Sequence, residues 1–151
     1  MTHLRDFIRR PLLLVTCLIV MAGCATTSPR VLEVTRSKYV SNIRPEDERV
    51  FARDRASHFR TEIVSLPAEQ QREMFFVRWN SAAVRSVKFE YRQVHKPDQI
   101  GQQRFAPARQ SSHTFVIRGE EFLTGGAVSA WRVSLWSPTD ELLAESKSAL
   151  W

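Results

Sequence analysis

The chain has 151 residues, of which 43% are hydrophobic and 25% are charged, and its formal net charge is +6 at pH 7. This length suffices for one folded domain with a short extension, so a second independent core is not expected. Basic residues are scattered among acidic ones and form no block. This distribution argues against a nucleic acid partner.

An apolar run near the start of the chain bears on every later inference. A basic stretch precedes residues 12–21, and Ala22 and Gly23 then lead to Cys24. The run is too short for a membrane-spanning helix, which needs about 20 apolar residues. The order of basic, apolar and small residues therefore predicts a signal peptide over residues 1–23.

The segment Met21-Ala22-Gly23-Cys24 resembles the lipobox of bacterial lipoproteins, in which small residues precede a cysteine that receives a diacylglyceryl group. The resemblance implies cleavage between Gly23 and Cys24 and a membrane anchor of several acyl chains on Cys24. Ala25 follows the cysteine, and the absence of Asp there resembles lipoproteins that are passed to an outer membrane. We therefore expect a lipid-anchored protein of the cell envelope, on the periplasmic face of the outer membrane. The alternative is an uncleaved apolar anchor or an ordinary signal peptide.

The segment after the cysteine is polar at first and then acidic. Residues 24–44 are expected to form an extended, lipidated tether, although Val31–Thr35 could form a short strand. Pro45 and the acidic trio Glu46–Glu48 are typical of a helix start, and a short helical segment over residues 45–59 is expected to pack on the domain. The trio could instead hold a metal ion, but consecutive carboxylates splay apart.

From residue 60 onward, apolar residues alternate with polar ones, as in half-buried β-strands. The predicted strands are Thr61–Leu66, Glu73–Trp79, Val87–Arg92, His113–Arg118, Trp131–Trp136 and Glu141–Trp151. Two intervening segments, His95–Ser112 and Gly119–Gly126, contain turn-forming residues and are expected to be loops.

The order of these strands carries a second resemblance. Phe76-Val77-Arg78-Trp79-Asn80, followed by Val87–Arg92 and by an alternating strand from Trp131, resembles fibronectin type III and other immunoglobulin-like domains. In that family a Trp plugs the core between the sheets, and the resemblance implies this role for Trp79. We therefore expect an all-β fold, an antiparallel immunoglobulin/fibronectin III-like sandwich over residues 60–151, preceded by the short helix and the extended tether.

Residues that could carry chemistry do not converge in the sequence. His58, His95 and His113 lie on three separate predicted elements, whereas zinc needs three or four converging ligands. Ser111–His113 offers no triad geometry, because neighbours in a strand point to opposite faces. Glu120-Glu121 lies in an expected loop and not across a cleft. We expect no catalytic residue, no metal and no cofactor.

Large side chains occur on the faces opposite the predicted core, namely Met74, Phe76, Trp136 and the terminal Trp151. Such residues mark a partner surface when they are exposed. Alternatively, residues 31–60 pack over that side and bury them. The leading hypothesis is a non-enzymatic lipoprotein whose sandwich binds an envelope protein or scaffolds an assembly. The alternative is a module that binds envelope polysaccharide or peptidoglycan.

Overall fold

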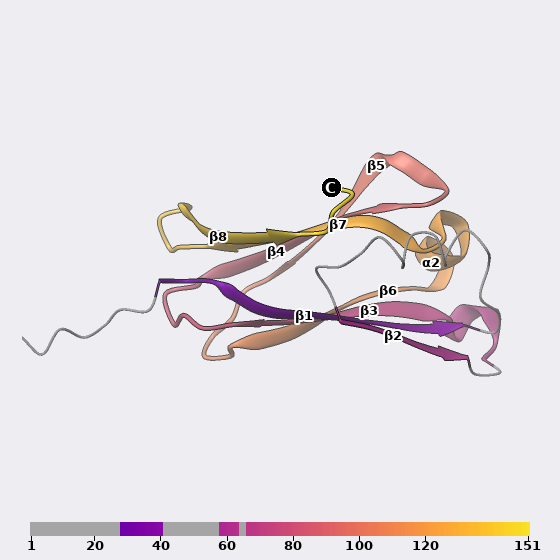
Figure 1. Cartoon of the computed structure of the whole chain (residues 1–151), viewed down its shortest axis with the longest axis horizontal. Helices are drawn as coiled ribbons and strands as arrows, with labels where there is room; N and C mark the ends of the chain where they lie inside the picture. Colours follow the sequence, from indigo (N-terminus) through magenta and orange to yellow (C-terminus); the bar gives the residue numbers. More distant parts are fainter. Residues whose placement is uncertain (1–27, 41–57, 64–65) are drawn as a thin grey trace, which may run out of the picture.

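Two four-stranded sheets pack face to face in the computed structural model, which describes residues 28–40, 58–63 and 66–151 (Figure 1). The first sheet has the order β2-β1-β3-β6, and the second has the order β5-β4-β7-β8. The expected all-β sandwich is thereby confirmed.

The first sheet contains β1 (Val31–Val40), β2 (His58–Ile63), β3 (Arg72–Trp79) and β6 (Ser112–Arg118). The second sheet contains β4 (Ser86–Gln93), β5 (Lys96–Phe105), β7 (Val128–Trp136) and β8 (Leu142–Lys147). Two short helical segments, η1 (Ala68–Gln70) and α2 (Gly119–Gly125), lie at one end.

Among the described strands, β1 and β2 pair in parallel and the other neighbours pair antiparallel. The groups β1-β3-β6 and β5-β4-β7-β8 have the connectivity of an immunoglobulin-like sandwich. Strand β2 is an addition beside β1.

The core lies between the sheets and is rich in aromatic side chains. The ring of Phe89 lies 4.8 Å from that of Phe75 and 5.0 Å from that of Phe115, measured between centroids. Trp79 is 1% exposed, and its ring lies 6.5 Å from that of Phe105, so the expected core-filling role of Trp79 is confirmed. Burial of each such side chain stabilises the fold by about 2–3 kcal/mol.

Residues 31–40 do not belong to a tether. They form β1, which lies between β2 and β3 in the first sheet, so the sandwich begins at Val31 and not at residue 60. These residues cannot cover the outer face of β3, because β1 lies beside β3 within the same sheet. The inward positions of β1 include Arg36 and Lys38, and these charges disguise the alternation that marks a buried strand.

The segment predicted as the loop His95–Ser112 contains β5, which pairs with β4. The prediction was wrong because β5 is an edge strand, whose side chains remain largely solvated and show no apolar alternation. The expected loop Gly119–Gly126 is mostly the short helix α2, of which only Phe122 and Gly125 are buried. The last strand ends at Lys147 and not at the last residue.

Some predictions fall outside the described residues. These include residues 1–27 with Cys24, and residues 45–57 of the expected helical segment. His58 and Phe59, the last two residues of that segment, belong to β2. Within the described ranges, no helix has the length and apolar character that a membrane span requires.

Candidate functional site

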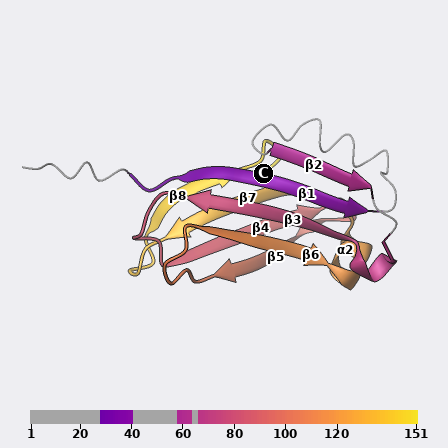
Figure 2. The ribbon, with the colours of Figure 1, turned by 90° about the horizontal axis from the view of Figure 1, so that it is seen from below.

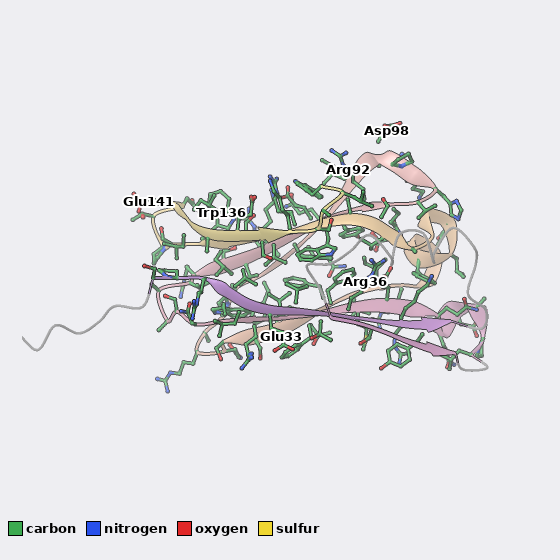
Figure 3. The ribbon with its side chains drawn as sticks, in the orientation of Figure 1. Glu33, Arg36, Arg92, Asp98, Trp136 and Glu141 are labelled. Carbon is green, nitrogen blue, oxygen red and sulfur yellow. The ribbon has the colours of Figure 1, made fainter. Side chains whose placement is uncertain are left out.

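The four large residues expected at a partner surface lie on opposite sides of the molecule. Met74 and Phe76 lie on the outer face of the β2-β1-β3-β6 sheet, onto which Figure 2 looks. Trp136 lies on the outer side of the other sheet (Figure 3). Trp151 lies near the guanidinium groups of that second sheet. The four residues therefore do not form one surface, and two candidate surfaces result.

The first surface is an apolar stripe, defined here as Met74, Phe76 and Val116. Met74 and Val116 are register partners across β3 and β6, and Phe76 comes two residues after Met74 on the same face. Phe76 is 37% exposed, whereas Met74 and Val116 are partly buried. Small hydroxyl side chains surround the stripe at the neighbouring register positions Thr35, Ser37 and Thr114. No helix or strand that the structure describes lies over it (Figure 2).

The second surface is a basic face, on the outer side of the β5-β4-β7-β8 sheet. Alternation and register place its charged side chains outward, opposite the buried ones. Its cations are Lys88, Arg92, Arg104, Arg132 and Lys147, and its carboxylates are Glu90, Asp98 and Glu145. Because cations outnumber carboxylates, this face attracts anions.

Glu90 organises the centre of the basic face. Its Oε1 lies 2.7 Å from Lys88 Nζ, and its Oε2 accepts a hydrogen bond of 2.9 Å from Arg132 Nε. Burial alone would raise the pKa of Glu90, but the hydrogen bonds from Lys88 and Arg132 outweigh it and hold the pKa below 4.5. The Glu90 carboxylate therefore stays ionised and holds the charged ends of Lys88 and Arg132 in place on this face.

The terminal residues fold back onto the same face. The Trp131 backbone amide donates to Ser148 Oγ at 3.0 Å, and the Ser148 amide donates to the Trp131 carbonyl at 2.9 Å. The Trp151 ring centroid then lies 4.8 Å from Arg132 Cζ and 5.4 Å from Arg92 Cζ. These distances are typical of cation–π contacts, so the indole is held among the arginines.

Three buried polar atoms at one end of the sandwich have no hydrogen-bond partner among the described residues, namely Trp79 Nε1, Ser86 Oγ and Trp136 Nε1. Ser86 and Trp136 are register partners at the start of β4 and the end of β7. Leaving such an atom unsatisfied costs about 1–3 kcal/mol, and ordered water commonly fills such positions.

A buried charged cluster was missed from the sequence: Arg36, Lys38 and Glu73 are at most 2% exposed. Arg36 Nε donates to Glu73 Oε1, and Arg36 Nη2 donates to the Val128 carbonyl at 2.6 Å. Glu73 Oε2 accepts from the Val128 amide at 2.9 Å, so the pair ties β1 and β3 to β7 in the other sheet. Figure 3 shows Arg36 between the sheets. In the sequence, this charged cluster is signalled by the alternation of Val34, Arg36 and Lys38. This pattern alone does not say which face of the strand is buried.

Tyr91 and Glu121 form a partly buried contact, in which the hydroxyl of the buried Tyr91 donates to Oε1 of the exposed Glu121. Burial and then this carboxylate raise the pKa of Tyr91 above its usual value. Glu121 lies on α2, so the helix is held against β4. The two carboxylates Glu120-Glu121 are thus not arranged as a pair across a cleft.

The predicted histidines lie apart in the fold. His58 begins β2, His95 lies between β4 and β5, and His113 is on β6. His113 stacks on Phe105 with 3.8 Å between ring centroids, and burial lowers its pKa. In the part of the chain that the structure describes, no three His, Cys, Asp or Glu residues are grouped as metal ligands would be.

The fold and its surfaces define an all-β sandwich with the apolar stripe on one outer face and an excess of cations on the other. Comparisons with family models, with curated proteins and with solved structures found no match.

Proposed function

We propose that this protein is a lipid-anchored, non-enzymatic binding module of the cell envelope. Cys24 carries the acyl chains, and the sandwich contacts an envelope protein through the apolar stripe. The lipobox-like segment Met21–Cys24 supports the anchor. The exposure of Phe76 in the middle of a sheet face supports the partner contact.

Phe76 is the observation that carries this proposal. Outward positions in an antiparallel sheet are polar when that face meets water. Here Phe76 lies beside Met74 and near Val116, with hydroxyl side chains around them. An apolar centre with a polar rim is the usual composition of a protein–protein contact, in which aromatic residues contribute most of the binding energy.

Photo-crosslinking in cells tests the partner contact. A photoreactive amino acid replaces Phe76 in one variant and Ile100 in a matched control, because Ile100 is 51% exposed on the edge strand β5. We expect one discrete adduct from position 76 that is lost when Met74→Ser is added, and no such adduct from position 100. Equal adducts from both positions, or none from position 76, would contradict the proposal.

Mass spectrometry of the protein extracted from membranes tests the anchor. We expect a chain that begins at Cys24 and carries acyl chains, and we expect the Cys24→Ser variant to be lost from the membrane fraction. A chain that retains residues 1–23 with an unmodified thiol would contradict lipidation.

A second candidate function is the binding of anionic envelope polysaccharide, and the cationic excess of the basic face favours it. Arg92 and Arg104 are exposed there, and Arg92 lies next to the ring of Trp151, which sugars can contact. Cosedimentation with peptidoglycan tests this candidate. The variant Arg92→Ala/Arg104→Ala should release the protein at lower salt than the wild type, because screening weakens exposed charge contacts. Phe76→Ser should not change this release.

A further inference from the structure

The first described residues of the chain are fastened to the turn after β3. The Arg30 amide donates to Asn80 Oδ1 at 2.8 Å, and the Asn80 amide donates to the Arg30 carbonyl at 3.3 Å. Asn80 Nδ2 also donates to the Ser28 carbonyl at 3.2 Å. The chain is therefore held to the sandwich from Ser28 onward.

This attachment leaves a very short link to the proposed lipid. Residues 25–27 separate Cys24 from Ser28. A fully extended chain advances at most about 3.5 Å per residue, so Ser28 lies within roughly 14 Å of Cys24. The headgroup layer on each side of a bilayer is about 5–8 Å thick. The turn around Asn80 must therefore lie close to the headgroups.

Three connections lie at this end of the sandwich, namely residues 80–85, 106–111 and 137–141. We call these connections, together with residues 28–30, the anchor end. The Trp79 amide donates to the Ser111 carbonyl at 2.9 Å, and the Arg85 amide donates to the Trp136 carbonyl at 2.8 Å. Figure 1 shows the start of β1 and the β7–β8 connection at the same end, and Figure 3 shows Glu141 there. Helix α2 and η1 lie at the other end.

The side chains of the anchor end suit a phospholipid surface. Arg30, Arg85 and Arg109 are all exposed there, and the exposed acids at this end are Asp140 and Glu141. A guanidinium binds a phosphate through two hydrogen bonds, which a compact ammonium group does not. Two leucines next to this end, Leu32 and Leu142, are 42% and 52% exposed, as suits contact with the interface of a bilayer.

We infer that the anchor end of the sandwich sits on the phosphate headgroups of the bilayer that holds the acyl chains, with Arg30, Arg85 and Arg109 in contact with the phosphates. This inference rests on the proposed lipidation of Cys24. Strand β1 has 10 residues and spans roughly 33 Å. Helix α2 and η1 therefore project away from the membrane, and both sheet faces remain available to partners.

Lipid-headgroup quenching tests the inference on the full lipidated protein. The protein is purified from membranes, its lipid on Cys24 is verified by mass spectrometry, and it is reconstituted in vesicles of phosphatidylethanolamine and phosphatidylglycerol with a nitroxide headgroup quencher. A fluorophore is placed on Ala83→Cys in the β3–β4 turn or on Glu120→Cys in α2, and both positions are exposed. We expect strong quenching at position 83 and none at position 120.

Arginine variants distinguish contact between the anchor end and the headgroups from attachment through the acyl chains alone. The variant Arg30→Gln/Arg85→Gln/Arg109→Gln should stay in the membrane but lower the quenching at position 83 roughly threefold, and high salt should act in the same direction. Arg118→Gln, an exposed arginine beside α2, is the matched control and should change nothing.

Three results would overturn the inference. Equal quenching at positions 83 and 120 would show a sandwich that lies flat on the bilayer. No quenching at position 83 with lipid verified on Cys24 would refute the seating and leave the anchor intact. An unmodified Cys24 would remove the proposed anchor and the inference together.

Discussion

Glu73 accepts a hydrogen bond from the guanidinium of Arg36 in the interior of the sandwich, where their side chains are 0% and 1% exposed. The two residues come from neighbouring strands, β3 and β1, and both also bond the backbone of Val128. The Arg36 guanidinium lies 5.3 Å from the Phe75 ring centroid as well. A buried pair of this kind is costly to break from either side, because the remaining charge would stay desolvated.

Breaking this pair should destabilise the protein strongly and non-additively. We expect Arg36→Met and Glu73→Met each to lower the free energy of unfolding by about 3–5 kcal/mol. The double variant should cost at least about 2 kcal/mol less than the sum, because neither charge is then left alone. Urea unfolding measures all three variants.

An exposed ion pair provides the control for that series. Arg78 and Glu33 approach to 3.0 Å, but the Arg78 side chain is 52% exposed. Arg78→Met should cost less than about 1 kcal/mol. Additive effects of Arg36→Met and Glu73→Met would contradict the coupling that we describe.

Glu90 should make stability depend on acid pH. Its pKa in the folded protein lies below 4.5, so the carboxylate stabilises the fold above that pH and loses this effect as pH falls through the folded pKa. Glu90→Gln should therefore cost about 1–2 kcal/mol at pH 7, because two charged hydrogen bonds are weakened, and this cost should shrink toward zero at strongly acid pH. Denaturant unfolding from pH 7 to pH 3 measures the difference, with the exposed Glu141→Gln as control. A pH-independent cost would argue against an ionic role.

His113 should make the stability of the protein depend on pH in a higher range than Glu90 does. Burial beside Phe105 lowers its pKa below 6.5, so the folded state favours the neutral ring. The unfolded chain then binds a proton first, and stability should fall as pH drops through about 6.5 toward the folded pKa. His113→Asn should remove this component of the pH dependence. Proton NMR titration checks the pKa directly, and a value above 6.5 would refute the account.

Gly101 lies where β5 passes the Tyr91 ring, at its register position on β4. A Cβ at Gly101 would overlap the Tyr91 ring atoms, so the ring or the strand would have to move. Gly101→Ala should lower the free energy of unfolding by about 1–3 kcal/mol, as overpacking does. The neighbouring Gln102→Ala, on an exposed position, should change it by less than about 0.5 kcal/mol. Thermal unfolding of both variants tests this, and equal effects would contradict it.

Much of the sandwich could be predicted because the residue order of its central strands shows which side chains are buried. In β3 and β4, apolar side chains occupy every second position, and the predicted Glu73–Trp79 and Val87–Arg92 agree with the structure within a residue at each end. The core-filling role of Trp79 was implied by the resemblance to immunoglobulin-like domains. Strands with one face on the core show this period wherever they lie in the sheet.

The first and fifth strands could not be predicted in the same way. β1 turns Arg36 and Lys38 inward, where Glu73 and the Val128 backbone compensate Arg36 from distant parts of the chain. β5 is an edge strand that needs few apolar residues. The inward face of β1 therefore depends on partners far away in sequence, which no local pattern reveals. β5 pairs with β4 directly before it in the chain, but its solvated edge position leaves no apolar alternation to recognise.

Residue order alone settled that this chain forms β-strands with buried aromatic residues, because a period of two is a local property of the backbone. Only the packing of the two sheets decided that Phe76 and Trp136 face opposite sides and that Arg36 lies inside. Which face of a strand becomes buried depends on the sheet that packs against it, and therefore on contacts between residues distant in the chain.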